Sequence, residues 1–309
     1  MILCCGEALI DMIPEMSASG DPCFVPKVGG AVFNTAVALG RLSADVGLFT
    51  GVSDDLFGAQ ITAELSNSNV KTDYLAKQNG PTSLAFVELT DGHASYTFYT
   101  QNAADTTLRM TDTPQDDTAI DALFFGGISL CTDPTATTMR DLMRRRTRDC
   151  VTMLDPNIRP SFISDEPAYR TRLADMIALA DIVKLSDEDL NWLVPNVQAT
   201  ETQIEKLAGS TSKIFIVTRG RDGADAFVGN TLFAHACATT VTVKDTVGAG
   251  DTFNAGVLHS LSQAGALTKS FCKSPDVTTL KNALAFAAKT AAITVSRKGA
   301  NPPWSHELD

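Results

Sequence analysis

The chain has 309 residues, of which 44% are hydrophobic and 20% are charged, a composition typical of a globular enzyme. Its formal net charge of −11 argues against a nucleic-acid-binding surface, because the phosphate backbone would be repelled. Seven cysteines without a Cys-x-x-Cys pair indicate reduced thiols, and the amino end lacks the basic region of a signal peptide. No apolar run reaches the roughly 18 residues of a membrane span. We therefore expect a soluble, cytoplasmic protein without a nucleic-acid or membrane partner.

The first residues predict a buried strand followed by polar groups in apolar surroundings. Residues 2–5 are apolar throughout, as expected of a strand covered on both faces. Asp11 follows within an apolar stretch, where a carboxylate is either paired structurally or presented to a ligand. Gly29-Gly30 opens a predicted helix with Asn34 in its first turn, which favours either a plain turn or a seat for a polyhydroxylated molecule. The segment lacks Gly-x-Gly-x-x-Gly spacing, which counts against a dehydrogenase.

A predicted β-hairpin then interrupts the alternation of strands and helices. A strand at 46–51 and a helix ending near Asn67 precede it. Residues 83–89 and 94–99 flank Asp91-Gly92, a dipeptide typical of a two-residue hairpin turn. The second strand mixes aromatic and polar residues, so the hairpin either covers a pocket or is a plain surface hairpin.

From residue 123 onward, strand and helix patterns alternate to the end of the chain. This order predicts a parallel sheet covered by helices, with ligands bound at the carboxyl ends of the strands. The expected strands lie at 123–127, 151–154, 181–185, 213–217, 224–228 and 240–243, and the expected helices at 134–147, 166–178, 200–208, 253–264 and 277–294.

Polar residues follow several of these strands. Asp155-Pro156-Asn157-Ile158-Arg159 places a carboxylate, an amide and a guanidinium just past a strand. Lys184-Leu185-Ser186-Asp187-Glu188-Asp189 places three acids at a helix start, where the helix dipole already explains them, although they could also hold waters around Mg²⁺. The turn from Thr218 to Gly223 carries two arginines that could face phosphates.

The stretch from Asp245 to Phe253 is the predicted chemical centre. Small residues at 248–250 let the backbone approach a ligand closely, and the first turn of a helix offers unpaired N–H groups that bind phosphate. Asp251 stands beside that site, where it could take a proton from an attacking hydroxyl; the alternative is a helix cap after a glycine turn. The chain has no Gly-x-x-x-x-Gly-Lys-[Ser/Thr], which excludes a P-loop kinase.

Together, the Gly29-Gly30 pair with Asn34, the 245–251 stretch and the spacing between them resemble the ribokinase-like sugar kinases over nearly the whole chain. The resemblance implies a Rossmann-like three-layer α/β/α fold with a small β-sheet lid. It implies a single kinase domain over 1–309, with lid strands inserted at about 11–28 and 82–102. It also implies phosphoryl transfer from MgATP to a sugar hydroxyl. A homodimer through the lid is a further hypothesis, since exposed sheet edges invite pairing.

The resemblance also assigns roles to individual residues. Asp251 is the expected catalytic base, and the N–H groups of Gly248, Ala249 and Gly250 line an anion hole. The expected substrate contacts are Asp11, Gly29, Gly30, Asn34 and Arg159, and the expected nucleotide contacts are Lys184, Ser186, Thr218, Gly220 and Gly223.

Two metal sites are implied in the same way. Asp245, with the carbonyl of Val247 and the loop near Gly299, matches the site of a monovalent cation such as K⁺. Where many members have Asn-x-x-Glu around Mg²⁺, this chain has Ser186-Asp187-Glu188-Asp189. Glu188 and Asp189 are expected to hold the ion through water, and which of the three acids serves stays open.

Residues 6–11, 155–160 and 184–189 look most like those of fructokinases, which favours conversion of D-fructose and ATP to D-fructose 6-phosphate and ADP. The alternatives are ribokinase and 2-keto-3-deoxygluconate kinase, whose members share Asp-x-Asn-x-Arg and whose substrate carboxylate would suit Arg159. A catalytically silent sugar-binding regulator is a hypothesis of a different class. Asp251 counts against it, because binding alone needs no base.

Overall fold

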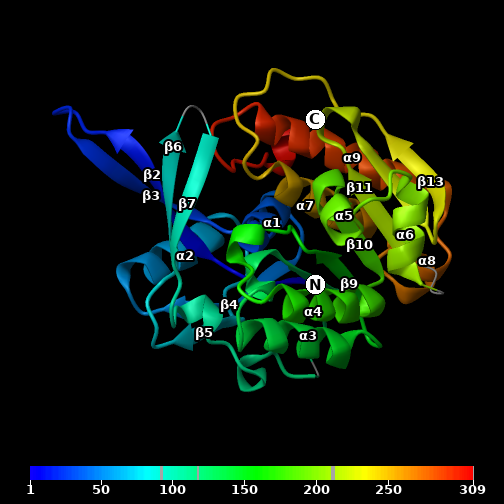
Figure 1. The fold of residues 1–309 in the computed structure, drawn as a ribbon, viewed down its shortest axis with the longest axis horizontal. Coiled ribbons are helices and arrows are strands. Elements are labelled where there is room, and N and C mark those ends of the chain that lie inside the picture. Colours follow the sequence, from blue (N-terminus) through cyan, green and yellow to red (C-terminus); the bar gives the residue numbers. More distant parts are fainter. Residues whose placement is uncertain (91–92, 117, 210–212, 309) are drawn as a thin grey trace.

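A nine-stranded sheet runs through the described part of the chain and separates two layers of helices (Figure 1). The computed structural model describes residues 1–90, 93–116, 118–209 and 213–308, so the predicted Asp91-Gly92 turn lies outside the described residues. Neighbouring strands are parallel except at β12, which is antiparallel to both neighbours. The strand order is β13 (Thr231–Ala236), β12 (Ala224–Val228), β11 (Ile214–Thr218), β10 (Ile182–Ser186), β9 (Val151–Asp155), β8 (Ala122–Gly126), β1 (Ile2–Cys5), β4 (Val46–Ser53) and β5 (Leu75–Gln78).

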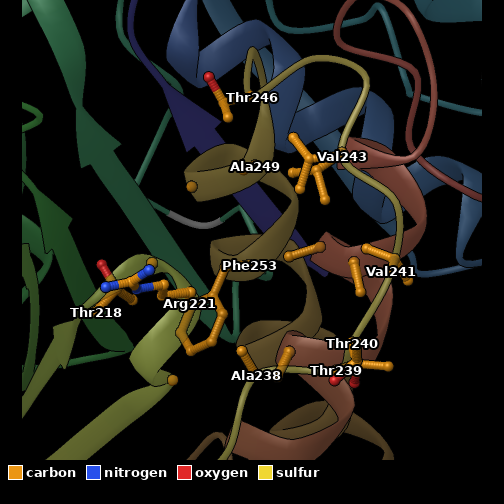
Figure 2. Close-up of a pocket in the computed structure, with 17 residues that line it drawn as sticks. Thr218, Arg221, Ala238, Thr239, Thr240, Val241, Val243, Thr246, Ala249 and Phe253 are labelled. Atoms are coloured by element: carbon orange, nitrogen blue, oxygen red, sulfur yellow. The ribbon is translucent and has the colours of Figure 1, made fainter.

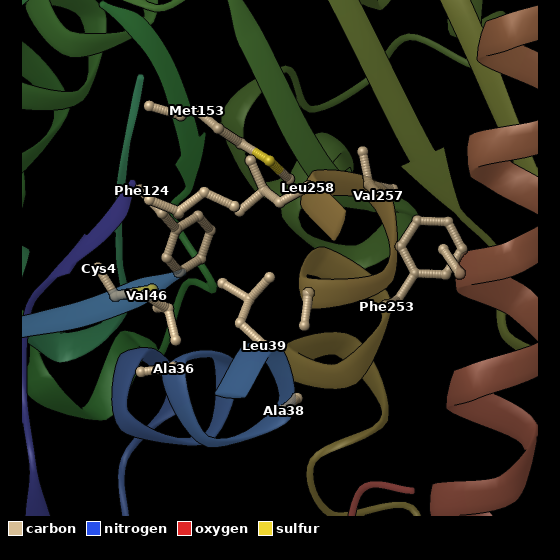
Figure 3. Packing of buried hydrophobic residues seen from close by; sticks show 14 of the residues in the cluster. Cys4, Ala36, Ala38, Leu39, Val46, Phe124, Met153, Phe253, Val257 and Leu258 are labelled. Carbon is tan, nitrogen blue, oxygen red and sulfur yellow. The ribbon is translucent and has the colours of Figure 1, made fainter. Parts of the chain in front are cut away.

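Alternate residues of the central strands face opposite helix layers, as the two-residue period of a strand requires. Cys4 belongs to one hydrophobic core and Leu3 to the other. Figure 3 shows the first core, where Phe124 of β8 lies close to Leu39 and Leu258 from two helices. The first layer contains α1 (Ala31–Arg41), α2 (Leu56–Asn67), α7 (Ala249–Gln263), α8 (Lys269–Lys273) and α9 (Val277–Val295), and the second contains α3 (Thr135–Arg146), α4 (Glu166–Leu179), α5 (Asp187–Leu193) and α6 (Thr200–Ala208).

A second, four-stranded sheet projects from this body (Figure 1). Its order is β3 (Pro22–Gly29), β2 (Leu9–Met16), β6 (Leu84–Thr90) and β7 (His93–Tyr99). Asp11 of β2 pairs with Ala85 of β6, which pairs with Phe98 of β7. Because paired residues on neighbouring strands project from the same face, Asp11 and Phe98 lie on one face of this sheet.

Helices α7 and α9 pack unusually close together. A Cβ at Gly256 of α7 would lie 2.6 Å from the Cα of Ala287 in α9, so only glycine fits there. One turn nearer the start of α7, the hydroxyls of Thr252 and Thr294 share a buried hydrogen bond of 2.9 Å. The contact therefore fixes the start of α7 relative to α9.

The predicted α/β fold is confirmed, and a second small sheet is present. The strand predicted at 240–243 is wrong. This segment pairs with no described strand, and just after it the N–H groups of Lys244 and Asp245 both donate to the carbonyl of Val295, at the end of α9. The next helix begins at Ala249 rather than at 253, which places Asp251 inside its first turn. None of the helices in the described ranges is long and apolar enough to cross a membrane.

Candidate active site

The start of α7 provides unpaired backbone donors. Gly248 precedes the helix with φ of 78°, and a Cβ there would lie 2.7 Å from the Cβ of Ala300, so the position requires glycine. The Ala249 N–H donates to the carbonyl of Thr246 at 3.3 Å. Within the described residues, the N–H groups of Gly250 and Asp251 have no acceptor. Together with the helix dipole, these two donors form a site for an anion.

Asp251 is buried beside these donors, with only 7% of its surface exposed. Its Oδ2 accepts a hydrogen bond of 2.9 Å from Nδ2 of Asn34 in the first turn of α1, which joins two residues predicted separately from the sequence. Burial raises the pKa of Asp251 to about 7, against the opposing effect of the Asn34 hydrogen bond. Asp155 raises this pKa further and Lys184 opposes it. Near neutral pH the carboxyl can therefore both accept and release a proton.

A buried ion pair lies next to this helix start. Lys184 of β10 donates to Oδ2 of Asp155 at 3.0 Å, and Asn254 of α7 donates to the same oxygen at 2.7 Å. Burial alone would lower the pKa of Lys184, but the carboxylates of Asp155 and Asp189 outweigh it and raise this pKa, so the amine stays charged. Its Nζ lies 3.4 Å from the position of a Cβ on Gly250. A cation thus stands against the anion site of α7.

The predicted acceptor residues meet where β2 and β3 enter the body of the protein. A Cβ on Gly29 would lie 2.2 Å from Oδ2 of Asp11, so glycine leaves this carboxylate its space. Burial raises the pKa of Asp11 to about 6. Gly30 has φ of 108° and starts α1 without a side-chain cap. The predicted acceptor residues Asp11, Gly29 and Asn34 thus come from three elements, β2, β3 and α1.

Glu7 is a buried residue that the sequence analysis did not select. Its Oε1 accepts from the N–H of Ala31 at 2.9 Å, and its Oε2 accepts from the N–H of Ser129 at 3.1 Å. Burial raises the pKa of Glu7, and these backbone hydrogen bonds oppose that effect. The carboxylate therefore holds the start of α1 against the loop after β8. A Gly-Glu pair directly after a buried strand was the available signal.

The acids at the start of α5 differ in their availability. Asp189 is 5% exposed, and its two oxygens accept from the N–H of Ile158 at 2.8 Å and from the N–H and hydroxyl of Ser186 at 3.0 and 2.8 Å. Ser186 is thus the cap of α5 and does not line the cavity described below. Glu188 is exposed. Arg159 is also exposed and donates to the neighbouring carbonyl of Ile158 at 3.0 Å.

A cavity of about 460 Å³ lies next to the start of α7 (Figure 2). The predicted nucleotide residues Thr218, Gly220 and Gly223 line it. Only one of the two arginines in this turn lines the cavity. Arg221 does, whereas Arg219 forms a salt bridge with Asp225 at 3.0 Å and is held away. Most of the remaining wall is apolar and comes from Ala238, Val241, Val243, Ala249, Phe253, Ala288, Ala291, Ala292 and Val295.

The loop before α7 is closed by Asp245. Its Oδ1 accepts from the N–H of Val247 at 3.1 Å, and its Oδ2 accepts from the N–H of Gly299 at 2.8 Å. The structure therefore brings together the three positions predicted for a monovalent cation. The carboxylate of Asp245 links the two loops.

The sequence pattern of the pfkB family carbohydrate kinases matches residues 1–307. The chain belongs to this family. It is 42% identical over 283 residues to the fructokinase of Rhizobium leguminosarum bv. trifolii. The matched region covers 91% of this chain and 86% of that protein.

Two solved fructokinases have the same fold. The Xylella fastidiosa enzyme with bound ATP has a TM-score of 0.88 at 30% identity and covers 99% of this chain and 97% of its own. The Vibrio cholerae O395 double mutant, in a form with fructose, ADP and potassium ion bound, has a TM-score of 0.83 at 26% identity and covers 97% and 93%. The predictions of a ribokinase-like fold and an ATP-dependent sugar kinase are confirmed.

Proposed function

We propose that this chain transfers the γ-phosphoryl group of ATP to the 6-hydroxyl of D-fructose, giving D-fructose 6-phosphate and ADP. The observation that carries the proposal is the buried carboxylate of Asp251 beside two unpaired N–H groups and the ammonium of Lys184. This array combines a base with positive groups that attract a polyanion. The similarity to fructokinases supports the choice of acceptor.

Asp251 acts as the general base. It takes the proton of the acceptor hydroxyl as that oxygen attacks the γ-phosphorus, and the Asn34 amide keeps its carboxylate in place. A pKa of about 7 suits this role, because a base is most effective when its pKa lies near the working pH. The N–H groups of Gly250 and Asp251, together with Lys184, stabilise the charge on the transferred group. The N–H of Ala249 joins them if its long bond to Thr246 opens.

The acids at the start of α5 are the proposed contacts of a hydrated magnesium ion. Mg²⁺ keeps several waters and binds through one or two carboxylates plus substrate phosphates, and when bound it neutralises phosphate oxygens. We assign the water contacts to the exposed Glu188, with Asp187 as the alternative, because the oxygens of Asp189 are occupied. Asp189 then has the supporting role of fixing the start of α5. The Val247 carbonyl and the Asp245 loop are the proposed place for K⁺.

The small sheet is proposed as a lid over the acceptor site in a single kinase domain. It presents Asp11 on the same face as Phe98, and the Phe98 ring lies 3.9 Å, between centroids, from Phe162 in the loop after β9. Asp11, Gly29, Gly30 and Asn34 are placed to bind sugar hydroxyls. Dimerisation through the lid and a cytoplasmic location remain proposals, the latter supported by seven unpaired cysteines.

Two measurements test the function. ADP release is followed with D-fructose, 2-keto-3-deoxygluconate, ribose and no sugar, and we expect D-fructose to give the highest kcat/KM. Strong turnover of another acceptor beside negligible turnover of fructose would reject the substrate assignment, and binding of ATP without turnover of any acceptor would favour a silent regulator. In Asp251→Ala, kcat should fall by at least about 10² with the fold intact by circular dichroism.

A further inference from the structure

Cys237 is the exposed member of the seven cysteines. Four of the others (4, 5, 150 and 272) are buried, and two (23 and 131) are partly exposed. Cys237 follows directly on the end of β13. Ala234 and Ala236 of this segment are buried, and His235 and Cys237 are exposed, so the strand alternation places the imidazole and the thiol on the same outer face.

Three side chains on this face are joined in series. Sγ of Cys237 lies 3.6 Å from Nε2 of His235, and Nδ1 of His235 lies 2.7 Å from Oδ1 of Asp225, its cross-strand partner on β12. An ionised carboxylate can only accept, so Nδ1 carries the proton of this hydrogen bond. In the neutral ring, Nε2 is then left with a lone pair that faces the thiol. This is the arrangement of a thiol with an oriented base.

Arg219 holds Asp225, the first residue of this series, in place. This side chain donates to the second oxygen of Asp225 at 3.0 Å and to the hydroxyl of Thr200 at 3.0 Å. Asp225 is therefore held by two partners, His235 and Arg219, while the thiol at the far end stays open to solvent. An exposed thiol beside a base is the environment in which cysteines react.

The same segment forms part of the wall of the nucleotide cavity. Ala238, next to Cys237, lines the cavity together with Gly223 (Figure 2). A Cβ on Gly223 would lie 2.2 Å from the carbonyl oxygen of Ala236 and 3.1 Å from the nitrogen of Ala238. The backbone on both sides of Cys237 thus packs directly on a cavity residue. A group attached to this exposed sulfur would lie on the backbone segment that forms part of that wall.

We propose that Cys237, with His235 and Asp225, is a thiol-modification site at which a low-molecular-weight disulfide forms a mixed disulfide and weakens nucleotide binding. His235 Nε2 takes the thiol proton, the Cys237 sulfur attacks one sulfur of the disulfide, and the S–S bond breaks. The departing thiolate takes up the proton and leaves as one thiol. The disulfide is thereby reduced by the protein thiol, and a second thiol reverses the exchange.

Reactivity is tested on the full chain without reference to kinase activity. With 5,5′-dithiobis(2-nitrobenzoate), we expect one fast equivalent of released thiolate that mass spectrometry maps to Cys237 and that disappears in Cys237→Ser. His235→Gln should slow this phase by about tenfold or more, whereas Cys23→Ser, which removes a partly exposed thiol on the small sheet, should leave it unchanged. A fast phase that survives in Cys237→Ser, or an unchanged rate in His235→Gln, would overturn the site.

The effect on the nucleotide rests on the proposed function and is measured separately. After stoichiometric reaction with glutathione disulfide, KM for ATP should rise about fivefold or more while KM for the sugar changes by less than about twofold, and dithiothreitol should restore both. Cys237→Ser treated in the same way should not change. An unaltered KM for ATP in fully modified protein would overturn the coupling. Absence of turnover before modification would instead reject the kinase proposal and leave the labelling result standing.

Discussion

Two helix starts in this protein carry an aspartate at the same position and treat it in opposite ways. In α5, Asp189 is the third helical residue after the cap Ser186, and in α7, Asp251 is the third helical residue after Gly248. Both follow the carboxyl side of the main sheet, and both are buried. Asp189 closes a capping box with Ser186 and also holds the N–H of Ile158. Asp251 has no cap to bond, and its carboxylate faces Asn34.

The residue before the helix decides between these outcomes. A serine at the cap offers a hydroxyl and a backbone N–H to the third residue, so the acid becomes part of the fold. A left-handed glycine offers no side chain and leaves both the acid and the neighbouring N–H groups available. Because Gly248 makes no side-chain cap hydrogen bond, the carboxylate of Asp251 and the first N–H groups of α7 are left available for chemistry. Three substitutions test this difference between the two helix starts.

The largest effect is expected from Asp251→Asn. Loss of the base should lower kcat by about 10²–10⁴, measured by ADP release with saturating sugar. The folded-state pKa of about 7 lies above the ordinary value of 3.8, so between about pH 4 and 7 the folded protein binds this proton more tightly than the unfolded chain. The ionised group thus costs stability as pH rises through that window.

The neutral variant should consequently be more stable than the parent by about 1–3 kcal/mol at pH 8 and about equal to it at pH 4. Urea denaturation at the two pH values measures this. A variant that gains nothing at pH 8 would show that burial does not penalise the charged form of Asp251.

Gly248→Ser is expected to rank second. The change supplies the missing cap residue but forces a side chain into φ of 78° and places its Cβ 2.7 Å from that of Ala300. Stability should fall by about 2–3 kcal/mol, and kcat should fall with it because the N–H groups move. The matched control is Gly265→Ser, where φ is 64° and a Cβ would meet no atom within 4 Å. Equal losses in both variants by thermal denaturation would remove the role of the Ala300 contact.

Asp189→Asn should have the smallest effect on turnover. An amide has only one acceptor oxygen, so it cannot satisfy every N–H and O–H donor that now surrounds the carboxylate. Stability should therefore fall by about 1–2 kcal/mol. The fall in kcat should stay well below that of Asp251→Asn, because the oxygens of Asp189 already hold Ile158 and Ser186. Ser186→Gly serves as the control and should cost only a few tenths of a kcal/mol. A collapse of kcat in Asp189→Asn at unchanged stability would instead make Asp189 part of the reaction centre.

The sequence was informative wherever the chemistry is local. Gly248, Gly250 and Asp251 lie within four residues, and their spacing alone predicted an anion site beside a base. Asn34 was predicted at a helix start, but its bond to Asp251 spans 217 residues and follows only from the way α1 and α7 pack. The pairing of Lys184 with Asp155 is also non-local, since it joins two neighbouring strands across 29 residues.

Tertiary neighbours decided the outcome at two further places. β-branched residues at 240–243 favour a strand, but a strand also needs a neighbour, and this segment has none among the described residues. Arg219 was one of two arginines that could face phosphates from a glycine turn, and it pairs instead with Asp225 on the next strand. In both cases the local pattern was correct for the residue type, and the tertiary neighbours decided the outcome.

The alignment of Asp251 depends on the close approach of α7 and α9 at Gly256. A methyl group there would push the two helices apart, because it would lie 2.6 Å from the Cα of Ala287. Since Asp251 lies on the same rigid rod little more than one turn away, such a wedge would tilt the carboxylate away from its acceptor without touching it. Differences in substrate turnover among related chains can therefore originate at the contact between Gly256 and Ala287, which binds neither sugar nor nucleotide.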